Sequence, residues 1–339
     1  DTEREFLMDA FDSGWISASG PYNKKLEDEF SKFCGVNYGS TVSNGTVAIH
    51  LAVRALELQK GDEVIVPSLT YVATFQAISS MGAIPVACEV DPDTLFIDVE
   101  DAESKITSKT KVIMPVHYAS SSKGMSDVYM LAEKYQLRVV EDAAQAFGCY
   151  RDKYKIGVLG DIVCFSFDGI KNITTGEGGA ILTDNKDNAI KCRELRDHGM
   201  SINKKYHYVD LGFNYRMTNM QAAIGLAQME RLDKILALRK KQMDHYYEIL
   251  SDVNGIKLRQ FALWTQPVHW LMTITLDRKY NRDHFLKYMQ DEGIDCRQMI
   301  NPVHQADHFR NEFKEDEYPN SIEISSQSVH LPSSTMLSR

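Results

Sequence analysis

The sequence lacks the features that mark membrane proteins, disulfide scaffolds and nucleic-acid binders. No apolar run is long enough to span a bilayer, and we expect no secretory signal. The six cysteines are scattered without a CxxC pair, which predicts reduced core thiols of a cytoplasmic protein and no metal site. Acidic residues outnumber basic ones by 47 to 38, and this net charge of −9 argues against a nucleic-acid partner.

What the chain does contain is enough apolar sequence for a large core. It has 339 residues, of which 43% are hydrophobic, and this length suggests two domains. Strand and helix patterns alternate, which predicts an α/β fold with a mostly parallel sheet flanked by helices. The strand patterns are 63–67, 84–88, 112–116, 137–142 and 162–167, and a helix pattern covers 126–135.

A long helical pattern from 218 to about 250 follows the strand–helix units. We place the domain boundary within it, with a large domain at 1–232, including an N-terminal arm, and a small domain at 233–339. The small domain has a strand pattern at 268–276, a helix pattern at 282–292 and a strand pattern at 294–300. These elements predict a small C-terminal α+β domain.

One lysine stands in an unusual setting between two apolar strands. Lys171 lies in the loop after strand 162–167 and before a second strand at 180–183, next to the glycine-rich turn 176–179. Most lysines sit on solvated surfaces, but a lysine held against apolar strands can have a lowered pKa and attack a carbonyl as an amine. On these residues alone, an ordinary surface loop is an equally good interpretation. No Gly-Lys-Ser/Thr follows the glycines, so the turn is not a P-loop.

Two further places have polar or aromatic residues where a ligand can bind. Residues 43–46 precede a helical pattern that starts at Val47, and free N–H groups at a helix start favour a phosphate. An ordinary N-cap is the simpler interpretation of these residues alone. Tyr71 follows strand 63–67 and either stacks on a planar ligand or fills core.

Asp142 ends a buried strand and begins the small-residue run 143–146. The strand resembles a Walker B strand, but without a P-loop that interpretation is weak. At the carboxyl end of a parallel sheet, where ligands bind, a carboxylate can hold a protonated pyridine nitrogen. The structural alternative for Asp142 is a helix N-cap.

Taken together, these segments resemble the DegT/DnrJ/EryC1/StrS family of sugar aminotransferases across essentially the whole chain. The resemblance implies the type I fold of pyridoxal-phosphate (PLP) enzymes, a homodimer, and transfer of an amino group from L-glutamate to a nucleotide-linked keto-sugar. Five segments carry it in order: SNGTVAIH (43–50), PSLTYVAT (67–74), EDAAQAFG (141–148), FSFDGIKNITTGEGG (165–179) and GFNYRMTNMQAAIG (212–225).

The resemblance also implies roles for residues around the cofactor. Lys171 matches the lysine that forms a Schiff base with PLP and then moves the substrate's Cα proton. Asp142 matches the partner of the pyridine nitrogen, and Tyr71 the aromatic ring that stacks on the cofactor. Gln145 matches a polar position near the ring's phenolic oxygen.

Other matched residues concern the cofactor phosphate and the substrates. Thr46, the backbone of Val47 and Ser166 match the phosphate cradle. Asn214 and Arg216 lie in the segment that reaches the phosphate from the partner subunit, so each active site is expected to be shared. Residues expected near the substrate are His304, for which a structural role is equally plausible, together with Lys123 and Asp168.

The sequence departs from the family's frequent pattern at 119–125, at Asp168 and at Phe147. None of these positions belongs to the expected PLP core, so the departures concern the acceptor sugar and its nucleotide. Three alternatives therefore stay open: a keto-sugar acid as acceptor, a PLP-dependent sugar dehydratase, and a non-catalytic sugar sensor. In the dehydratases histidine typically replaces the Schiff-base lysine, so Lys171 argues against that alternative.

Overall fold

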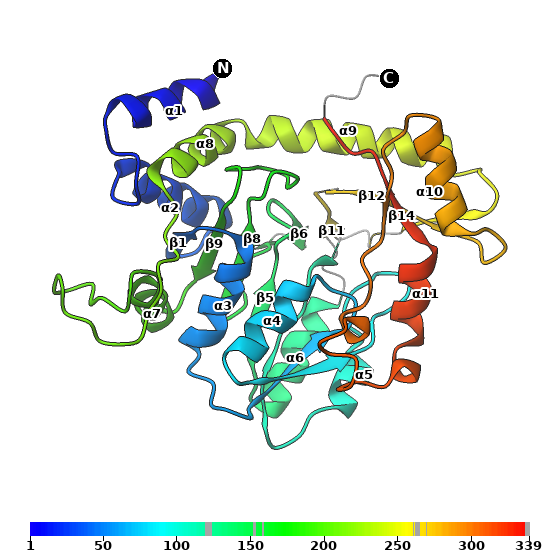
Figure 1. The fold of residues 1–339 in the computed structure, drawn as a ribbon, viewed down its shortest axis with the longest axis horizontal. Coiled ribbons are helices and arrows are strands. Elements are labelled where there is room, and N and C mark those ends of the chain that lie inside the picture. The colour runs from blue at the N-terminus through cyan, green and yellow to red at the C-terminus, as the bar shows by residue number, and fades with distance from the viewer. Residues whose placement is uncertain are drawn as a thin grey trace.

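A seven-stranded sheet forms the centre of the molecule, with strand order β1-β9-β8-β5-β4-β2-β3 (Figure 1). The structure, a computed structural model, describes residues 1–118, 124–151, 154–157, 159–259, 261, 265–268 and 270–335. Strands β8, β5, β4, β2 and β3 are parallel, while β9 and β1 are antiparallel to their neighbours. The predicted mostly parallel sheet is confirmed. Its strands are β1 (Tyr38–Val42), β2 (Glu63–Pro67), β3 (Ile84–Cys88), β4 (Thr110–Ile113), β5 (Arg138–Asp142), β8 (Ile162–Ser166) and β9 (Gly179–Thr183).

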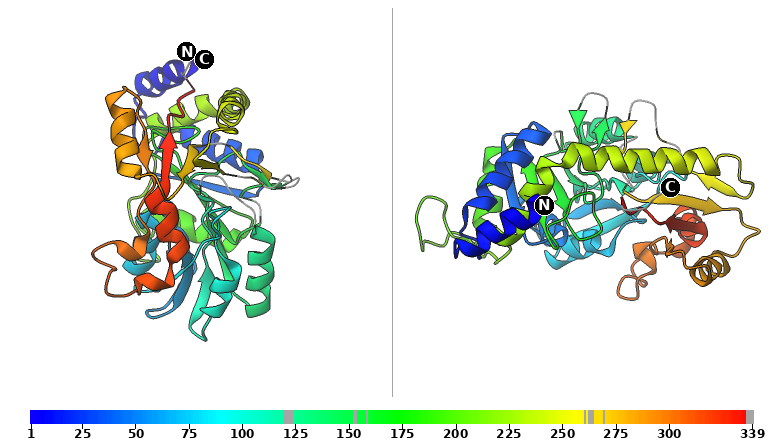
Figure 2. Two further views of the ribbon diagram at one scale, coloured as in Figure 1. Left: turned by 90° about the vertical axis from the view of Figure 1, so that its right-hand side faces the viewer. Right: turned by 90° about the horizontal axis from the view of Figure 1, so that it is seen from above.

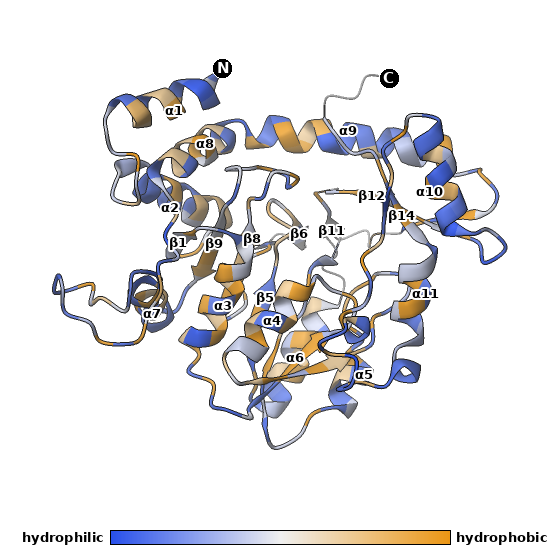
Figure 3. Ribbon diagram, in the orientation of Figure 1, coloured by the Kyte–Doolittle hydropathy of each residue, from blue (hydrophilic) through white to orange (hydrophobic). Residues whose placement is uncertain are grey.

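Helices cover both faces of this sheet, and the strands alternate their side chains between two cores. In β8, Ile162 and Cys164 belong to the core that includes helices α3 and α4. Val163 and Phe165 belong to the opposite core, with α2 and α8. This period of two is the side-chain geometry of a strand buried on both faces. Figure 3 shows apolar strands inside and more polar helices such as α7 outside.

The expected helix from 218 to about 250 is wrong, because the structure has two helices there. The chain leaves helical geometry at Arg231, where φ is −110° and ψ is 6°. Helix α8 packs against α1 and α2, whereas α9 runs on across the top of the molecule in Figure 1. The helices of this part are α1 (Thr2–Asp12), α2 (Pro21–Cys34), α3 (Gly45–Ala55), α4 (Val72–Ser80), α5 (Val99–Ser104), α6 (Met125–Tyr135), α7 (Lys186–Arg196), α8 (Asn219–Glu230) and α9 (Leu232–Leu250).

The C-terminal part forms an antiparallel four-stranded sheet in the order β10-β12-β14-β13, with α10 (Arg282–Asp291) and α11 (Pro319–Gln327). A three-stranded sheet also pairs C-terminal β11 (Thr265–Gln266) with β6 (Tyr150–Arg151), which pairs in turn with β7 (Tyr154–Lys155). The domain division at 232/233 stays a prediction. The four-stranded sheet consists of β10 (Ile256–Leu258), β12 (Met272–Leu276), β13 (Arg297–Gln298) and β14 (Ser328–Leu331).

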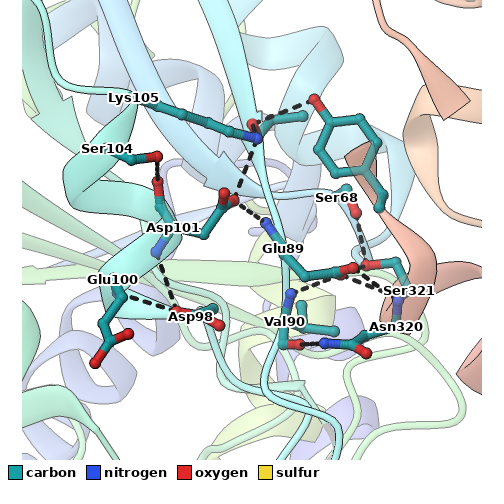
Figure 4. A network of polar contacts seen from close by, with 12 residues as sticks. Ser68, Glu89, Val90, Asp98, Glu100, Asp101, Ser104, Lys105, Asn320 and Ser321 are labelled. Carbon is teal, nitrogen blue, oxygen red and sulfur yellow. Dashed lines mark hydrogen bonds and ion pairs between the residues drawn. The ribbon is translucent and has the colours of Figure 1, made fainter. Parts of the chain in front are cut away.

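A buried carboxylate joins α11 to the central sheet (Figure 4). Glu89, directly after β3, accepts hydrogen bonds from the backbone N–H groups of Asn320 at 2.7 Å and Ser321 at 3.0 Å. The hydroxyl of Ser321 also donates to Glu89 and accepts a hydrogen bond from Ser68. A carboxylate at a helix N-terminus satisfies free N–H groups and complements the helix dipole. Glu89 therefore fixes α11 against the sheet edge.

The described residues contain no helix long and apolar enough to cross a membrane. Among the same residues, no group of three or more histidine, cysteine or carboxylate side chains is arranged to hold a metal ion.

Candidate active site

Lys171 lies in the loop after β8, with its amine partly buried beneath a residue from the C-terminal part of the chain. Its Nζ atom is 4.1 Å from the centre of the Trp270 ring. Burial lowers the pKa of the amine, although the carboxylates of Asp142 and Asp168 oppose that effect. The structure thus gives Lys171 the environment of an amine nucleophile and not that of a surface lysine.

Two residues that the sequence did not reveal hold this loop in place. The indole N–H of Trp270 donates to the carbonyl of Ile170 at 2.8 Å. The guanidinium of Arg239, on α9, donates to the carbonyl of Lys171 at 3.2 Å. Both contacts come from far along the chain, so no local sequence signal points to them.

Asp142 ends β5 at the carboxyl edge of the parallel strands and is buried. Its Oδ2 accepts a hydrogen bond from the Thr74 hydroxyl at 2.8 Å, and Oδ1 accepts one from the N–H of Ala144 at 3.1 Å. Burial raises the pKa of Asp142, while these two hydrogen bonds and the charge of Lys171 oppose the rise. The carboxylate and the amine therefore lie close enough for each charge to act on the pKa of the other.

The first turn of α3 and Ser166 meet beside this pair. A Cβ on Gly45 would lie 2.6 Å from Cβ of Ser166, so only glycine allows the helix start to approach β8 this closely. The exposed Thr46 and the half-buried Val47 follow directly. The N–H of Val47 donates to the side chain of Asn44 at 3.0 Å, which is the N-cap that the sequence allowed as the simpler interpretation.

Tyr71 and Gln145 border the same region. Tyr71 immediately precedes α4 and is 61% exposed as a residue, so its ring is available to stack on a ligand. Gln145 is buried three residues after Asp142.

Asn214 and Arg216 lie on the outer side of a segment that borders the phosphate candidates. The N–H of Ser43 donates to the carbonyl of Tyr215 at 2.9 Å. Arg216 forms an ion pair with Asp197 at 3.0 Å, and its Nε donates to Oδ1 of Asn214 at 3.2 Å. The internal ion pair that would make Arg216 structural is therefore present.

The substrate candidates are more widely separated. His304 is buried, and its ring stacks on Tyr318 at 4.5 Å. Burial lowers its pKa to about 4, and within the described residues neither ring nitrogen has a hydrogen-bond partner. This position favours the structural alternative for His304. Asp168 lies three residues before Lys171, and its backbone carbonyl accepts a hydrogen bond from the backbone N–H of Lys171. Lys123 lies outside the described residues.

The site combines a lysine amine and a carboxylate, whose charges interact, with the meeting point of a helix N-terminus and a serine. The sequence profile of the DegT/DnrJ/EryC1/StrS aminotransferase family matches residues 1–339. The chain belongs to this family.

Relatives within the family are closely similar over most of their length. The GDP-perosamine synthase of Caulobacter vibrioides is 43% identical over 306 residues, which cover 89% of this chain and 82% of that protein. The structure of DesV from S. venezuelae superimposes with a TM-score of 0.94 at 33% identity, covering 99% of this chain and 90% of that one. A candidate sugar aminotransferase of Streptococcus pneumoniae in its PLP form gives a TM-score of 0.94 at 27% identity, covering 99% and 92%.

Membership of this aminotransferase family confirms the expected fold, the enzyme class and PLP as the cofactor. The residues present fit PLP chemically. Asp142 suits a protonated ring nitrogen, Lys171 an aldehyde, and the α3 N-terminus with Ser166 a phosphate. The roles of the individual residues stay predictions.

Proposed function

We propose that this aminotransferase moves an amino group from L-glutamate to a GDP-linked keto-sugar. The observation that carries the proposal is the Lys171 amine under the Trp270 ring, whose pKa burial lowers and whose charge interacts with the Asp142 carboxylate. An amine that loses its proton more readily can act as a base near neutral pH. A protein that only senses a sugar has no need of such a pair.

In this proposal the bound PLP supplies an aldehyde that carries the amino group and a ring that withdraws electrons. Lys171 would hold the cofactor, and its amine, once free, would take the proton from the donor's Cα at the Nζ atom. Asp142 keeps a proton on the ring nitrogen through its negative charge. Ser166 and the first turn of α3 bind and orient the phosphate. The same residues act in reverse when the keto-sugar enters.

We further propose a homodimer in which Asn214 reaches the partner's cofactor phosphate. The rings of Phe213 and Tyr215 stack on each other at 4.7 Å, and both contact His50 on α3 of their own chain. Neighbouring side chains of an extended segment point to opposite sides, so Asn214 faces away from its own α3. It is exposed, and Arg216 already holds its Oδ1, which leaves the amide nitrogen to donate outward.

The surface around this segment supports the homodimer. The loop between α7 and α8 projects from the body of the molecule in two perpendicular views (Figures 1 and 2). Single soluble chains rarely expose many large apolar side chains together, so a second copy is the simplest cover. Exposed large apolar residues of the loop are Ile202, Tyr206, Tyr208, Val209 and Leu211.

The cytoplasm is the compartment we propose for this enzyme. All six cysteines are free thiols, and five of them are buried in the core. Burial raises the pKa of Cys34 and Cys192 to about 12, which keeps these thiols protonated and unreactive. Unpaired thiols fit a reducing compartment.

The acceptor is proposed from the relatives. GDP-perosamine synthases of Caulobacter vibrioides and Vibrio cholerae are 43% and 37% identical to this chain. We propose that the product is GDP-perosamine or another amino sugar linked to GDP.

Absorption spectra of the PLP-loaded enzyme test both halves of the proposal. Adding L-glutamate should bleach the yellow colour, and so should GDP-perosamine, because the second half-reaction is reversible. Amino sugars linked to other nucleotides serve as controls and should bleach it far more slowly. A protein that stays yellow with every amino donor is a sensor or a dehydratase. If glutamate bleaches the colour and GDP-perosamine does not, the aminotransferase activity would be supported and the proposed acceptor would be refuted.

A further inference from the structure

Behind Asp142 lies a short chain of buried hydroxyl groups. The Thr74 hydroxyl is 2.8 Å from Oδ2 of Asp142, and the Thr70 hydroxyl is 3.1 Å from that of Thr74. Both threonines are at most 1% exposed. The N–H of Thr74 also donates to the carbonyl of Tyr71, so the first turn of α4 fixes where the hydroxyl lies.

The direction of the hydrogen bonds in this chain follows from proton counting. An ionised carboxylate only accepts, so Thr74 must donate its single hydroxyl proton to Asp142. Thr74 then has only lone pairs to offer to Thr70, so Thr70 must donate to Thr74. Both hydroxyl dipoles therefore point toward Asp142. Such an arrangement stabilises a negative charge on the carboxylate and fixes the orientation of its plane.

We propose that Thr74 is a positioning residue that keeps Asp142 ionised and turned toward the cofactor, with Thr70 orienting the Thr74 hydroxyl. The proposal rests on the proposed role of Asp142 as the partner of the ring nitrogen. Oδ1 is held by the N–H of Ala144 and Oδ2 by Thr74, so the carboxylate cannot rotate without losing a hydrogen bond. One carboxylate oxygen can accept more than one hydrogen bond, which leaves capacity for a ring N–H.

Other groups near the carboxylate act on its charge as well. Lys171 and His117 favour the ionised form of Asp142, and the Cys164 thiol lies close to it on β8. His117 is already paired with the neighbouring Glu141 at 2.7 Å. Burial opposes ionisation most strongly, and among the groups that favour it the Thr74 hydrogen bond contributes most. Removing this hydrogen bond should therefore shift the titration of Asp142 visibly.

Infrared difference spectra of the apoprotein test the proposal without any turnover. The spectrum of each variant minus that of the same variant carrying Asp142→Asn isolates the carboxyl stretch of protonated Asp142. In Thr74→Val, an isosteric change, this stretch should persist to a pH higher by roughly one unit, because a charge-assisted hydrogen bond is lost. Thr74→Ser should restore the original midpoint, and Thr70→Val should shift it less than Thr74→Val does.

A second readout connects the threonine to catalysis. In the PLP-loaded enzyme, Thr74→Val should slow the glutamate half-reaction at least tenfold and move the acid limb of its pH profile upward. Thr74→Ser should rescue most of the rate. An unchanged carboxyl midpoint in Thr74→Val would overturn the proposal, and Thr74→Ala gives the same readout if the valine variant does not fold. A shifted midpoint in a protein that shows no transamination would instead refute the proposed function.

Discussion

The amine of Lys171 lies 4.1 Å from the centre of the Trp270 ring, although the two residues are almost a hundred positions apart in the sequence. The ring contributes two opposing effects. It shields the amine from water, which favours the neutral form, and its face attracts the ammonium form. The pKa of Lys171 is lowered overall, so the burial to which Trp270 contributes prevails.

Trp270→Ala should therefore raise the pKa of Lys171, because water reaches the amine. Labelling of the apoprotein with an amine reagent, followed by peptide mapping, gives the rate at Lys171 as a function of pH. The half-point of that profile should move upward in the variant, and transamination at neutral pH should fall but recover at alkaline pH. Trp270→Phe keeps a ring over the amine and should move the half-point less. Unchanged profiles would mean that other residues exclude the water.

Asp142→Asn should slow transamination while leaving the fold intact. The amide has the size of the carboxylate but no negative charge with which to hold a proton on the cofactor ring. We expect a rate at least about a hundredfold lower, or roughly 3 kcal/mol of barrier. Stopped-flow measurement of the glutamate half-reaction gives the rate, and circular dichroism checks the fold. A rate close to that of the wild type would remove Asp142 from the site.

The shared active site predicts complementation between two inactive proteins. Asn214→Ala with Arg216→Ala should be nearly inactive, and so should Lys171→Ala. In a mixed dimer one site carries both defects and the other carries neither. Random pairing makes half of the dimers mixed, each with one good site of two, so activity should return to about a quarter of wild type.

Two controls complete the complementation experiment. Native mass spectrometry must detect the mixed dimers, since unmixed proteins would give no activity for a trivial reason. Arg216→Ala alone should reduce activity less than Asn214→Ala, because Arg216 is engaged with Asp197. Mixed dimers without activity would show that the phosphate contact lies within one chain.

Glu89→Gln should lower the thermal stability of the protein. The change removes the negative charge at the start of α11. The glutamine amide also places an NH2 group, a donor, where the N–H groups of Asn320 and Ser321 need an acceptor (Figure 4). Loss of a buried charged acceptor costs about 1–3 kcal/mol. Calorimetry should give a lower Tm for Glu89→Gln than for the control Glu100→Gln, whose carboxylate is exposed in the first turn of α5. Equal Tm values would show that α11 docks without Glu89.

The sequence predicted strand limits best where a short apolar run has a clear end, whereas the predicted strand 112–116 is observed as β4 (Thr110–Ile113) and β1 (Tyr38–Val42) was not predicted. Strands β2 and β3 have the predicted limits, since the apolar runs end where the buried segments end. The break between α8 and α9 was missed, because Arg231 is compatible with a helix and only packing against different neighbours separates the two.

In the candidate site, too, some residues could be predicted from the sequence and others could not. Lys171 and Asp142 stood out because charged residues at the ends of apolar strands are locally unusual. Thr74 was overlooked, although its spacing of four from Thr70 at the start of α4 is visible in the sequence. Trp270 and Arg239 reach Lys171 only through the tertiary fold, so periodicity carries no signal for them.

The most direct test of this account is to identify the lysine that bonds to the cofactor. Borohydride reduction of the PLP-loaded enzyme fixes the cofactor on its lysine, and peptide mapping by mass spectrometry then locates the label. The label should appear on Lys171, and Lys171→Ala should still bind PLP through phosphate and ring contacts while losing the label and the transamination. A label on any other lysine of the wild-type enzyme would contradict the account.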